Sequence, residues 1–152
     1  MPGQEGLELT AVGVNPLRTV RGSTRLVWGT RIRTDDPDWK YLPVRRLALY
    51  IEESVERGTR WAVSQPNDDS LWAQVRLHTN AFMQDLFLKK ALLGSKPEQA
   101  YFTRCDKQTT SAEDLKKGMF TIQIGFAAVK TGEFQIITVH QRARPLQTEV
   151  TK

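Results

Sequence analysis

Three aspartates lie close to several basic side chains in RTDDPDWKYLPVRR, residues 33–46. Neighbouring carboxylates such as Asp35, Asp36 and Asp38 can act as general acid and general base in catalysis. Aspartates are also common in turns that precede a helix, where they accept hydrogen bonds from backbone N–H groups. No other part of the chain supplies a second catalytic element for these carboxylates. The sequence therefore does not predict an enzyme.

Metal and nucleophile chemistry lack the residues that they require. The chain has two histidines, His78 and His140, and one cysteine, Cys105, all far apart in the sequence, whereas a zinc site needs clustered ligands. No serine has the surroundings of a nucleophile elbow, and no glycine-rich loop follows a strand as a phosphate cradle would. We expect no metal and no cofactor. We expect His78 at the edge of the core, His140 as a cross-strand side chain, and Cys105 as a buried thiol.

Length and composition are typical of one globular domain. The chain has 152 residues, of which 39% are hydrophobic and 26% are charged, as in folded proteins with a sizeable core. No apolar run approaches the roughly 20 residues of a membrane helix, and the first residues lack the pattern of a secretion signal. One cysteine excludes an internal disulfide. We expect no membrane anchor, and a protein that is cytosolic or part of an assembly built in the cytosol.

The positive charge is concentrated early in the chain. Residues 18–46 hold eight basic side chains and three aspartates, which accounts for the whole net charge of +5. Arginines alternate with Trp28 in this segment, which favours a basic nucleic-acid-binding module with a stacking residue. The same alternation places Trp28 on the face opposite Arg31 and Arg33, and an interface rich in Arg and Trp fits it equally well. From the residues alone, both interpretations stay open.

The first third of the chain predicts an arm, a strand and a helix. Residues 1–24 are rich in Gly and Pro, as in a linker or arm. Residues 25–33 alternate in polarity and predict a strand. Pro43 suits a first helical turn, and the apolar spacing after it predicts a helix that ends near Gly58. The stretch between is a strand–turn–helix junction, whose site candidates are Asp36, Pro37, Trp39, Arg45 and Arg46.

Two arginines in this junction lie where a helix disfavours cations. Arg45 and Arg46 fall in the first helical turn, where a cation opposes the helix dipole by roughly 0.3–1 kcal/mol. We expect the neighbouring aspartates, or an acidic partner molecule, to offset this repulsion.

The rest of the chain alternates between strand and helix patterns. We expect a short strand at 59–63, a long helix that begins after Asp68 or Asp69, a strand at 100–105, a short helix at 109–118 and a hairpin at 119–141. The expected apolar stripe of the long helix is Leu71, Val75, His78, Phe82 and Leu86.

This order of elements predicts an α+β fold: a mixed β-sheet covered by two main helices, with a C-terminal β-hairpin and extended terminal arms. The expected boundaries are an arm at 1–24, a domain at 25–141 and a C-terminal arm at 142–152.

Several stretches of the chain resemble a known family in the same order. They include GVNPLR, VWGTR, DPDWKYLPVRRLALYIEESVERGTRWAV and AYFTRCD. These stretches closely resemble the C-terminal domain of contractile phage tail sheath proteins, a domain also found in related contractile injection systems. The resemblance runs from about Gly13 to His140. It implies a structural protein and not an enzyme.

The resemblance also implies an assembly and its partners. Sheath subunits of this family polymerise as hexameric rings, stacked in a helix around an inner tube, and contract on a signal from the baseplate to drive the tube through a cell envelope. The implied partners are the chain itself or a full-length sheath protein, the inner tube protein and the baseplate, and not nucleic acid. The implied location is a virion tail or an assembled contractile device, made in the bacterial host cytoplasm.

Site residues follow from the resemblance as expectations. Arms of neighbouring subunits would add strands to the sheet of this domain, so the hairpin and the tail would belong to a subunit mesh. The mesh residues would be Phe120, Ile122, Ile124, Phe134, Ile136, Arg142 and Arg144. Possible contacts with an acidic inner tube are Lys89, Lys90, Lys116 and Lys117, although lysines at helix ends also simply complement the helix dipole. Sheath subunits extend further before GVNP, so we expect a fragment or a short sheath-like protein.

Overall fold

The computed structural model describes residues 14–19 and 25–145. The chain divides into two compact units, residues 1–49 and 50–152. The helices, 3-10 turns and strands, in chain order, are β1 (Leu17–Arg18), β2 (Leu26–Val27), η1 (Pro37–Trp39), α2 (Leu42–Gly58), η2 (Arg60–Ser64), α3 (Asp69–Leu88), α4 (Pro97–Ala100), β3 (Tyr101–Arg104), α5 (Ala112–Lys116), β4 (Met119–Lys130) and β5 (Glu133–Arg142).

The first unit contains a two-stranded antiparallel ribbon of β1 and β2. The strand expected at 25–33 is confined to Leu26–Val27. Beyond it, the amide of Asn15 replaces a strand neighbour: its Nδ2 donates to the carbonyl of Arg31 at 2.7 Å, and the Arg31 N–H donates to its Oδ1 at 3.1 Å. This arrangement requires Gly29, which has a φ of 139° and where a Cβ would lie 2.5 Å from the Asn15 Oδ1.

The junction at 35–46 consists of a loop and the first turn of α2. The loop turns back, so that the first residue of α2 is hydrogen-bonded to the chain just before the loop. The carboxylate of Asp36 accepts a hydrogen bond from the N–H of Asp38 at 2.9 Å and begins η1. The N–H of Leu42 then donates to the carbonyl of Thr30 at 2.6 Å. The aspartates therefore serve a turn before a helix, as their positions predicted.

Helix α2 has the bounds that the sequence predicted. Pro43 is in its first turn and Gly58 is its last residue. Its buried side chains recur at helical spacing, which is typical of one apolar face. They are Val44, Ala48, Ile51 and Val55.

Residues 59–63 do not form the expected strand, because the chain continues to coil as η2. The hydroxyl of Thr59 donates to the carbonyl of Val55 at 2.7 Å, and the N–H of Ala62 donates to the carbonyl of Thr59 at 3.0 Å. An apolar run of this length does not distinguish a strand from a helical turn. Local hydrogen bonds to the end of α2 decide the outcome.

Helix α3 begins where a cap was expected. The Asp68 carboxylate accepts a hydrogen bond from the N–H of Leu71 at 2.8 Å, which satisfies a backbone donor of the first turn.

The expected apolar stripe of α3 is partly wrong. His78 is exposed and makes an edge contact with the ring of Trp61, with centroids 5.5 Å apart, and Phe82 is only half-buried. The buried face instead includes Thr79 and Met83, each one position after the expected His78 and Phe82. Because Thr79 is polar, the apolar spacing of this face is hard to recognise in the sequence. The buried side chains are Leu71, Trp72, Val75, Thr79, Met83 and Leu86.

The second unit is built on a three-stranded antiparallel sheet in the order β3-β4-β5. The strand expected at 100–105 and the hairpin expected at 119–141 are confirmed as β3 and as β4 with β5. Parallel pairing, which a mixed sheet requires, occurs in the described ranges only as an isolated bridge between Pro66 and Arg144. The short helix is confirmed as α5, with Ser111 as its N-cap.

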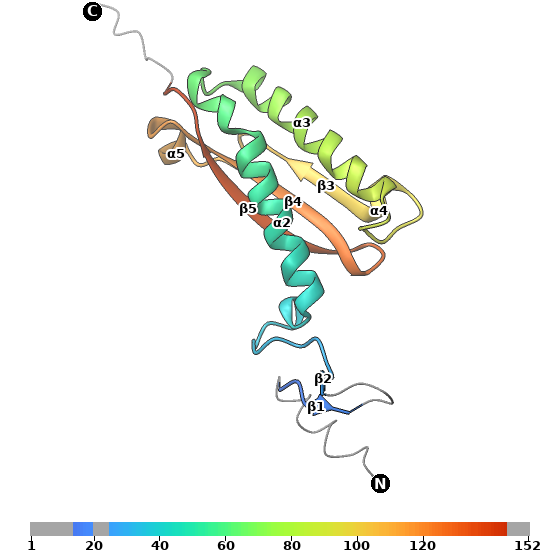
Figure 1. Ribbon diagram of the computed structural model, residues 1–152. Coiled ribbons are helices and arrows are strands. Elements are labelled where there is room, and N and C mark those ends of the chain that lie inside the picture. The colour runs from blue at the N-terminus through green and yellow to red at the C-terminus, as the bar shows by residue number, and fades with distance from the viewer. Residues whose placement is uncertain (1–13, 20–24, 146–152) are drawn as a thin grey trace, which may run out of the picture. The chain divides into compact units, whose positions relative to one another are not determined.

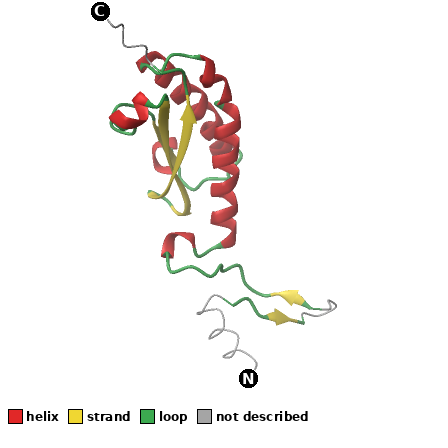
Figure 2. Cartoon of the chain, turned by 90° about the vertical axis from the view of Figure 1, so that its left-hand side faces the viewer, coloured by secondary structure: helices red, strands yellow, loops and turns green. Residues whose placement is uncertain are grey.

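Helix α3 and the second half of α2 lie on one face of this sheet (Figures 1 and 2). Hydrogen bonds join α3 to β3: the hydroxyl of Tyr101 donates to Gln84 at 2.8 Å, and the hydroxyl of Thr103 donates to Asn80 at 2.6 Å. The core between the helices and the sheet contains fully buried side chains of β4, which are Phe120, Ile122, Ile124 and Phe126. The α+β fold is confirmed.

The chain is held to the domain beyond the end of β5. Ala143 is buried. The N–H of Arg144 donates to the carbonyl of Gln65 at 2.8 Å, and the N–H of Asn67 donates to the carbonyl of Arg144 at 3.0 Å. The first residues of the predicted C-terminal arm are therefore part of the fold. The rest of that arm, 146–152, and most of the predicted N-terminal arm lie outside the described residues.

Candidate functional site

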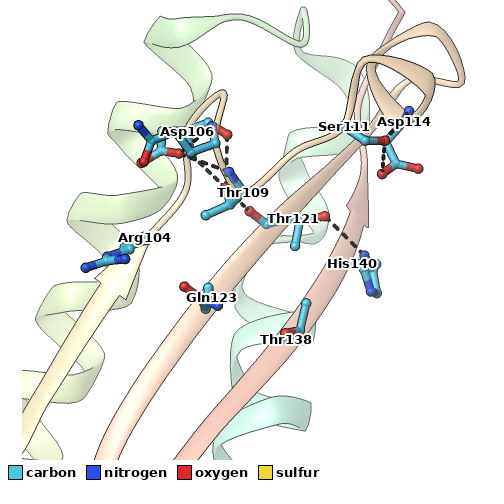
Figure 3. Close-up of a pocket in the computed structure, with 10 residues that line it drawn as sticks. Arg104, Asp106, Thr109, Ser111, Asp114, Thr121, Gln123, Thr138 and His140 are labelled. Atoms are coloured by element: carbon cyan, nitrogen blue, oxygen red, sulfur yellow. Dashed lines mark hydrogen bonds between the residues drawn. The ribbon is translucent and has the colours of Figure 1, made fainter.

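The face of the sheet opposite α3 and the second half of α2 carries a polar half and an apolar half. In the polar half, Arg104, Gln123 and Thr138 lie opposite one another on three neighbouring strands, and Thr121 lies opposite His140 in the next row. Figure 3 shows these side chains on the same side of the sheet. Cross-strand neighbours of this kind interact directly.

The apolar half is organised around a glycine. Gly125 lies between Phe102 on β3 and Ile136 on β5. The ring of Phe102 occupies the space above it, since a Cβ at Gly125 would lie 2.1 Å from the Phe102 Cε1. This position lets the ring meet Phe134 edge-on, with centroids 5.2 Å apart at 82°. Ile136 beside them is 50% exposed.

The polar half is hollowed into a recess of about 570 Å³, which we call the outer recess. Its floor is formed by the strands, and its wall by the loop at 106–110 and the start of α5 (Figure 3). The side chains that line it are Arg104, Asp106, Gln108, Thr109, Ser111, Asp114, Thr121, Gln123, Thr138 and His140.

The wall of the outer recess is rigidly hydrogen-bonded. The Asp106 carboxylate accepts hydrogen bonds from the N–H groups of Gln108 at 2.8 Å and Thr109 at 3.0 Å. The hydroxyl of Thr109 donates to the carbonyl of Thr121 at 3.0 Å, and the hydroxyl of Thr110 accepts from the N–H of Thr121 at 3.1 Å. The loop thus replaces β3 as the neighbour of β4 at this end of the sheet.

Strand β5 is an edge strand. Its outer side has no strand neighbour among the described residues. The side chain of Gln141 reaches across to α2, where it donates to the carbonyl of Glu56 at 2.6 Å and contacts the hydroxyl of Thr59 at 3.0 Å. A long edge presents backbone N–H and C=O groups that can pair with a further strand.

The predicted mesh residues fall into two groups. Phe120, Ile122 and Ile124 are fully buried and hold the sheet to the helices within this chain. The other four are on the surface of β5 or just beyond it, where a neighbouring chain could reach them. They are Phe134, Ile136, Arg142 and Arg144.

The four lysines proposed for tube contact do not lie together. Lys89 and Lys90 follow α3, near the hairpin end of β4, while Lys116 and Lys117 end α5 at the start of β4 (Figure 1). The ammonium of Lys89 donates to the carboxylate of Asp85 at 2.6 Å, and this hydrogen bond raises the pKa of Lys89. The two residues are four positions apart on the helix, a spacing at which opposite charges stabilise each other.

At Arg45 the expected offset of the dipole repulsion comes from an aromatic ring and not from a carboxylate. Within the described part of the chain, no ion pair joins Arg45 or Arg46 to an aspartate. The guanidinium of Arg45 instead lies over the ring of Trp39, 5.4 Å from its centroid. Such a cation–π contact is worth roughly 0.5–1 kcal/mol at an exposed site, which is comparable with the dipole repulsion.

The single cysteine and the potential metal ligands lie outside the outer recess or apart from one another in the described part of the chain. Cys105 is buried, and burial raises the pKa of its thiol to about 12, so the thiol is protonated and inert near neutral pH. In residues 14–19 and 25–145, no group of three His, Cys, Asp or Glu side chains is placed to hold a metal ion. Over the same ranges, no helix is both long enough and apolar enough to cross a membrane.

The outer recess was not predicted from the sequence. Its signal is weak: polar residues alternate in β4 and β5 at Thr121, Gln123, Thr138 and His140. Alternation of this kind indicates an exposed face, and His140 is indeed a cross-strand partner of Thr121, as predicted. It does not indicate that a distant loop encloses that face.

Comparisons with known proteins identify the family. Residues 34–142 match the family described as the phage tail sheath C-terminal domain. The chain is 34% identical to a chain of the anti-feeding prophage (AFP) baseplate, over 90% of this chain and 38% of that chain, with a TM-score of 0.76. It is 31% identical to a chain of the PVC sheath complex, an extracellular contractile injection system in the contracted state, over 90% of this chain and 39% of that chain, with a TM-score of 0.74.

A more distant structure shows the fold alone. The sheath tail protein of Listeria innocua is 13% identical over 93% of this chain and 34% of its own length, with a TM-score of 0.68. No curated protein sequence matches the chain. This chain spans about two fifths of the length of the AFP baseplate chain and of the PVC sheath chain.

The comparisons support a structural sheath role and not the nucleic-acid-binding alternative. With a family match over most of the chain and the same fold in known sheath proteins, the chain belongs to the phage tail sheath C-terminal domain family.

Proposed function

We propose that the chain is a structural subunit, or part of one, of a contractile sheath that polymerises around an inner tube and contracts to drive it through a cell envelope. The observation that carries this proposal is the family match over residues 34–142, together with 31% identity to a chain of a sheath complex in the contracted state. A domain of this kind acts through contacts between subunits, and it needs neither catalysis nor a cofactor.

The proposed partners are other copies of the chain or a full-length sheath protein, the inner tube protein and the baseplate. The solved relatives support this choice, since they come from a baseplate and a sheath complex. The proposed location is a phage tail or an assembled injection device, made in the cytoplasm of a bacterial host.

Strand addition at β5 is the proposed mode of linkage. The outer side of β5 offers ten residues of backbone, and main-chain hydrogen bonds to an added strand would supply affinity without a large side-chain interface. Phe134 and Ile136 on the exposed face would be covered by the same neighbour. This linkage suits a device that moves, since a strand can stay attached while the domains that it joins rotate.

Contact with the tube would use one pair of lysines and not both. Lys89 and Lys90 lie at the opposite end of β4 from Lys116 and Lys117, so one flat contact does not engage all four. Exposed ion pairs contribute about 0–1 kcal/mol each. Repeated over many subunits, such pairs hold an extended sheath and still allow its release.

The test is negative-stain electron microscopy with sedimentation, on the purified chain alone and mixed with the tube-like protein encoded beside it. Rings, tubes or decorated filaments are expected. A stable monomer that neither assembles nor sediments with the tube contradicts the proposal for this chain.

Two matched double variants assign the tube contact. Lys89→Glu with Lys90→Glu, and Lys116→Glu with Lys117→Glu, make the same change of charge at opposite ends of the sheet. One of them should abolish sedimentation with the tube protein and the other should leave it intact. Equal effects of the two variants would indicate general electrostatic attraction and no defined contact.

A further inference from the structure

The floor of the outer recess carries hydrogen-bond donors that the described residues do not use. Arg104 forms no ion pair or hydrogen bond there, and its guanidinium lies over the ring of Phe102, 5.2 Å from the centroid. The amide of Gln123 and the hydroxyl of Thr138, which lie in the same cross-strand row, also have no side-chain partner in the described part of the chain. All three side chains line the recess (Figure 3).

The acidic groups of the recess are already engaged. The Asp106 carboxylate accepts hydrogen bonds from two backbone N–H groups of its own loop. The Asp114 carboxylate accepts a hydrogen bond from the hydroxyl of Ser111 at 2.7 Å. Neither carboxylate forms an ion pair with Arg104. The recess therefore has a fixed, acidic wall, and on its floor Arg104 forms no ion pair with the described residues.

We propose that the outer recess binds a side-chain carboxylate on an acidic segment of a partner polypeptide. A guanidinium binds a carboxylate through two parallel hydrogen bonds, and the amide N–H groups of Gln123 and the hydroxyl of Thr138 supply further donors beside it. At about 570 Å³ the recess is within the roughly 300–1,000 Å³ of ordinary ligand sites. That volume accommodates several residues of an extended segment and not only one ion.

A polypeptide suits this recess better than a nucleic acid. A nucleic acid brings closely spaced phosphates, and Asp106 and Asp114 on the wall repel a row of negative charges. A single carboxylate can bind Arg104 on the floor. Neutral or basic groups of the same segment then lie against Asp106 and Asp114 on the wall. If the proposed function holds, the partner is a neighbouring sheath chain, and only this choice of partner rests on that function.

The two histidines of the chain make the test direct. His140 lines the outer recess, and His78 is exposed on α3 at the other face of the sheet, beside Trp61. The ring signals of both histidines are followed by NMR while the peptide acetyl-Gly-Glu-Gly-amide is added to the intact chain. The His140 signals are expected to shift to saturation and the His78 signals to stay unchanged. The matching Gln peptide should produce no saturable shift.

Substitution at Arg104 provides the second arm of the test. Arg104→Gln is expected to weaken binding of the Glu peptide by about three- to fivefold, as for an exposed ion pair. Arg57→Gln removes the same charge from an exposed site on α2 and should leave binding unchanged. Circular dichroism melting curves establish that both variants are folded.

Three results would overturn the proposal. The Gln peptide could shift His140 as much as the Glu peptide, Arg57→Gln could weaken binding as much as Arg104→Gln, or a short single-stranded oligonucleotide could bind the recess in preference to the Glu peptide. All three are measured on the unassembled chain. Failure of this proposal is therefore distinct from failure of sheath assembly, which microscopy reports.

Discussion

Substituting Gly125 by alanine should destabilise the chain, although the same change usually stabilises a strand. A Cβ at this position would lie 2.1 Å from the Phe102 Cε1, so the ring must move. Moving it breaks the edge contact with Phe134 and exposes apolar surface, a loss of roughly 1–2 kcal/mol. Replacing Gly by Ala also restricts the unfolded chain, a gain of about 0.4–1 kcal/mol. The net expectation is a loss of about 1 kcal/mol.

A double-mutant cycle separates these two effects. In a Phe102→Ala background no ring occupies the space, so Gly125→Ala should stabilise by about 0.5 kcal/mol. The two substitutions should therefore be coupled by about 1.5 kcal/mol. The free energy of unfolding is measured by urea titration, and Gly58→Ala in α2, where a Cβ meets no atom within 4 Å, is the control. Equal destabilisation by Gly125→Ala in both backgrounds would refute the role given to the ring.

Three further outcomes are expected. Asn67→Ala should lower the free energy of unfolding by about 3 kcal/mol in urea titrations, because it leaves the buried indole N–H of Trp72 without its acceptor at 2.8 Å; a loss below about 1 kcal/mol would argue against this buried contact. Asp68→Ala should cost about 1 kcal/mol through loss of the α3 cap, whereas Asp69→Ala, whose ion pair is exposed, should change stability by less than about 0.5 kcal/mol. Because burial raises the pKa of Cys105 to about 12 from 9.0, the folded state holds the thiol proton more tightly than the unfolded state. The free energy of unfolding should therefore fall by about 2 kcal/mol between pH 8 and pH 10.5 relative to the Cys105→Ala variant, and parallel pH profiles of the two proteins would contradict this.

Elements with local signals were predicted well from the sequence. Pro43 and Gly58 mark the two ends of α2, Asp68 caps α3, and the alternation in β4 and β5 identifies the hairpin. In the two helices the residues that form the hydrogen bonds lie within a few positions of one another, and the two strands of the hairpin are joined by a two-residue turn. Local preference and the final fold therefore agree.

Features for which the local pattern is ambiguous, or which depend on distant residues, were not predicted. The segment after Thr59 coils because it bonds to the end of α2, although its composition suits a strand equally well. Thr79 occupies a core position on α3, and its polarity conceals the true apolar face. The outer recess exists because the loop at 106–110 pairs with Thr121 of β4 through hydroxyl groups, and no pattern in either segment alone reveals that pairing.

The hydrogen bonds that hold the segment after β5 also determine how the domain would carry a mechanical load. The backbone of Arg144 is hydrogen-bonded through its N–H to Gln65 and through its carbonyl to Asn67. The side chain of Asn67 in turn donates a hydrogen bond to the carbonyl of Met119 and accepts one from the indole of Trp72. A force applied beyond Pro145 would therefore be transmitted directly to the first turn of α3 and the first residue of β4. A load on this end would pull on the rigid body of the domain before it could peel β5 from the sheet.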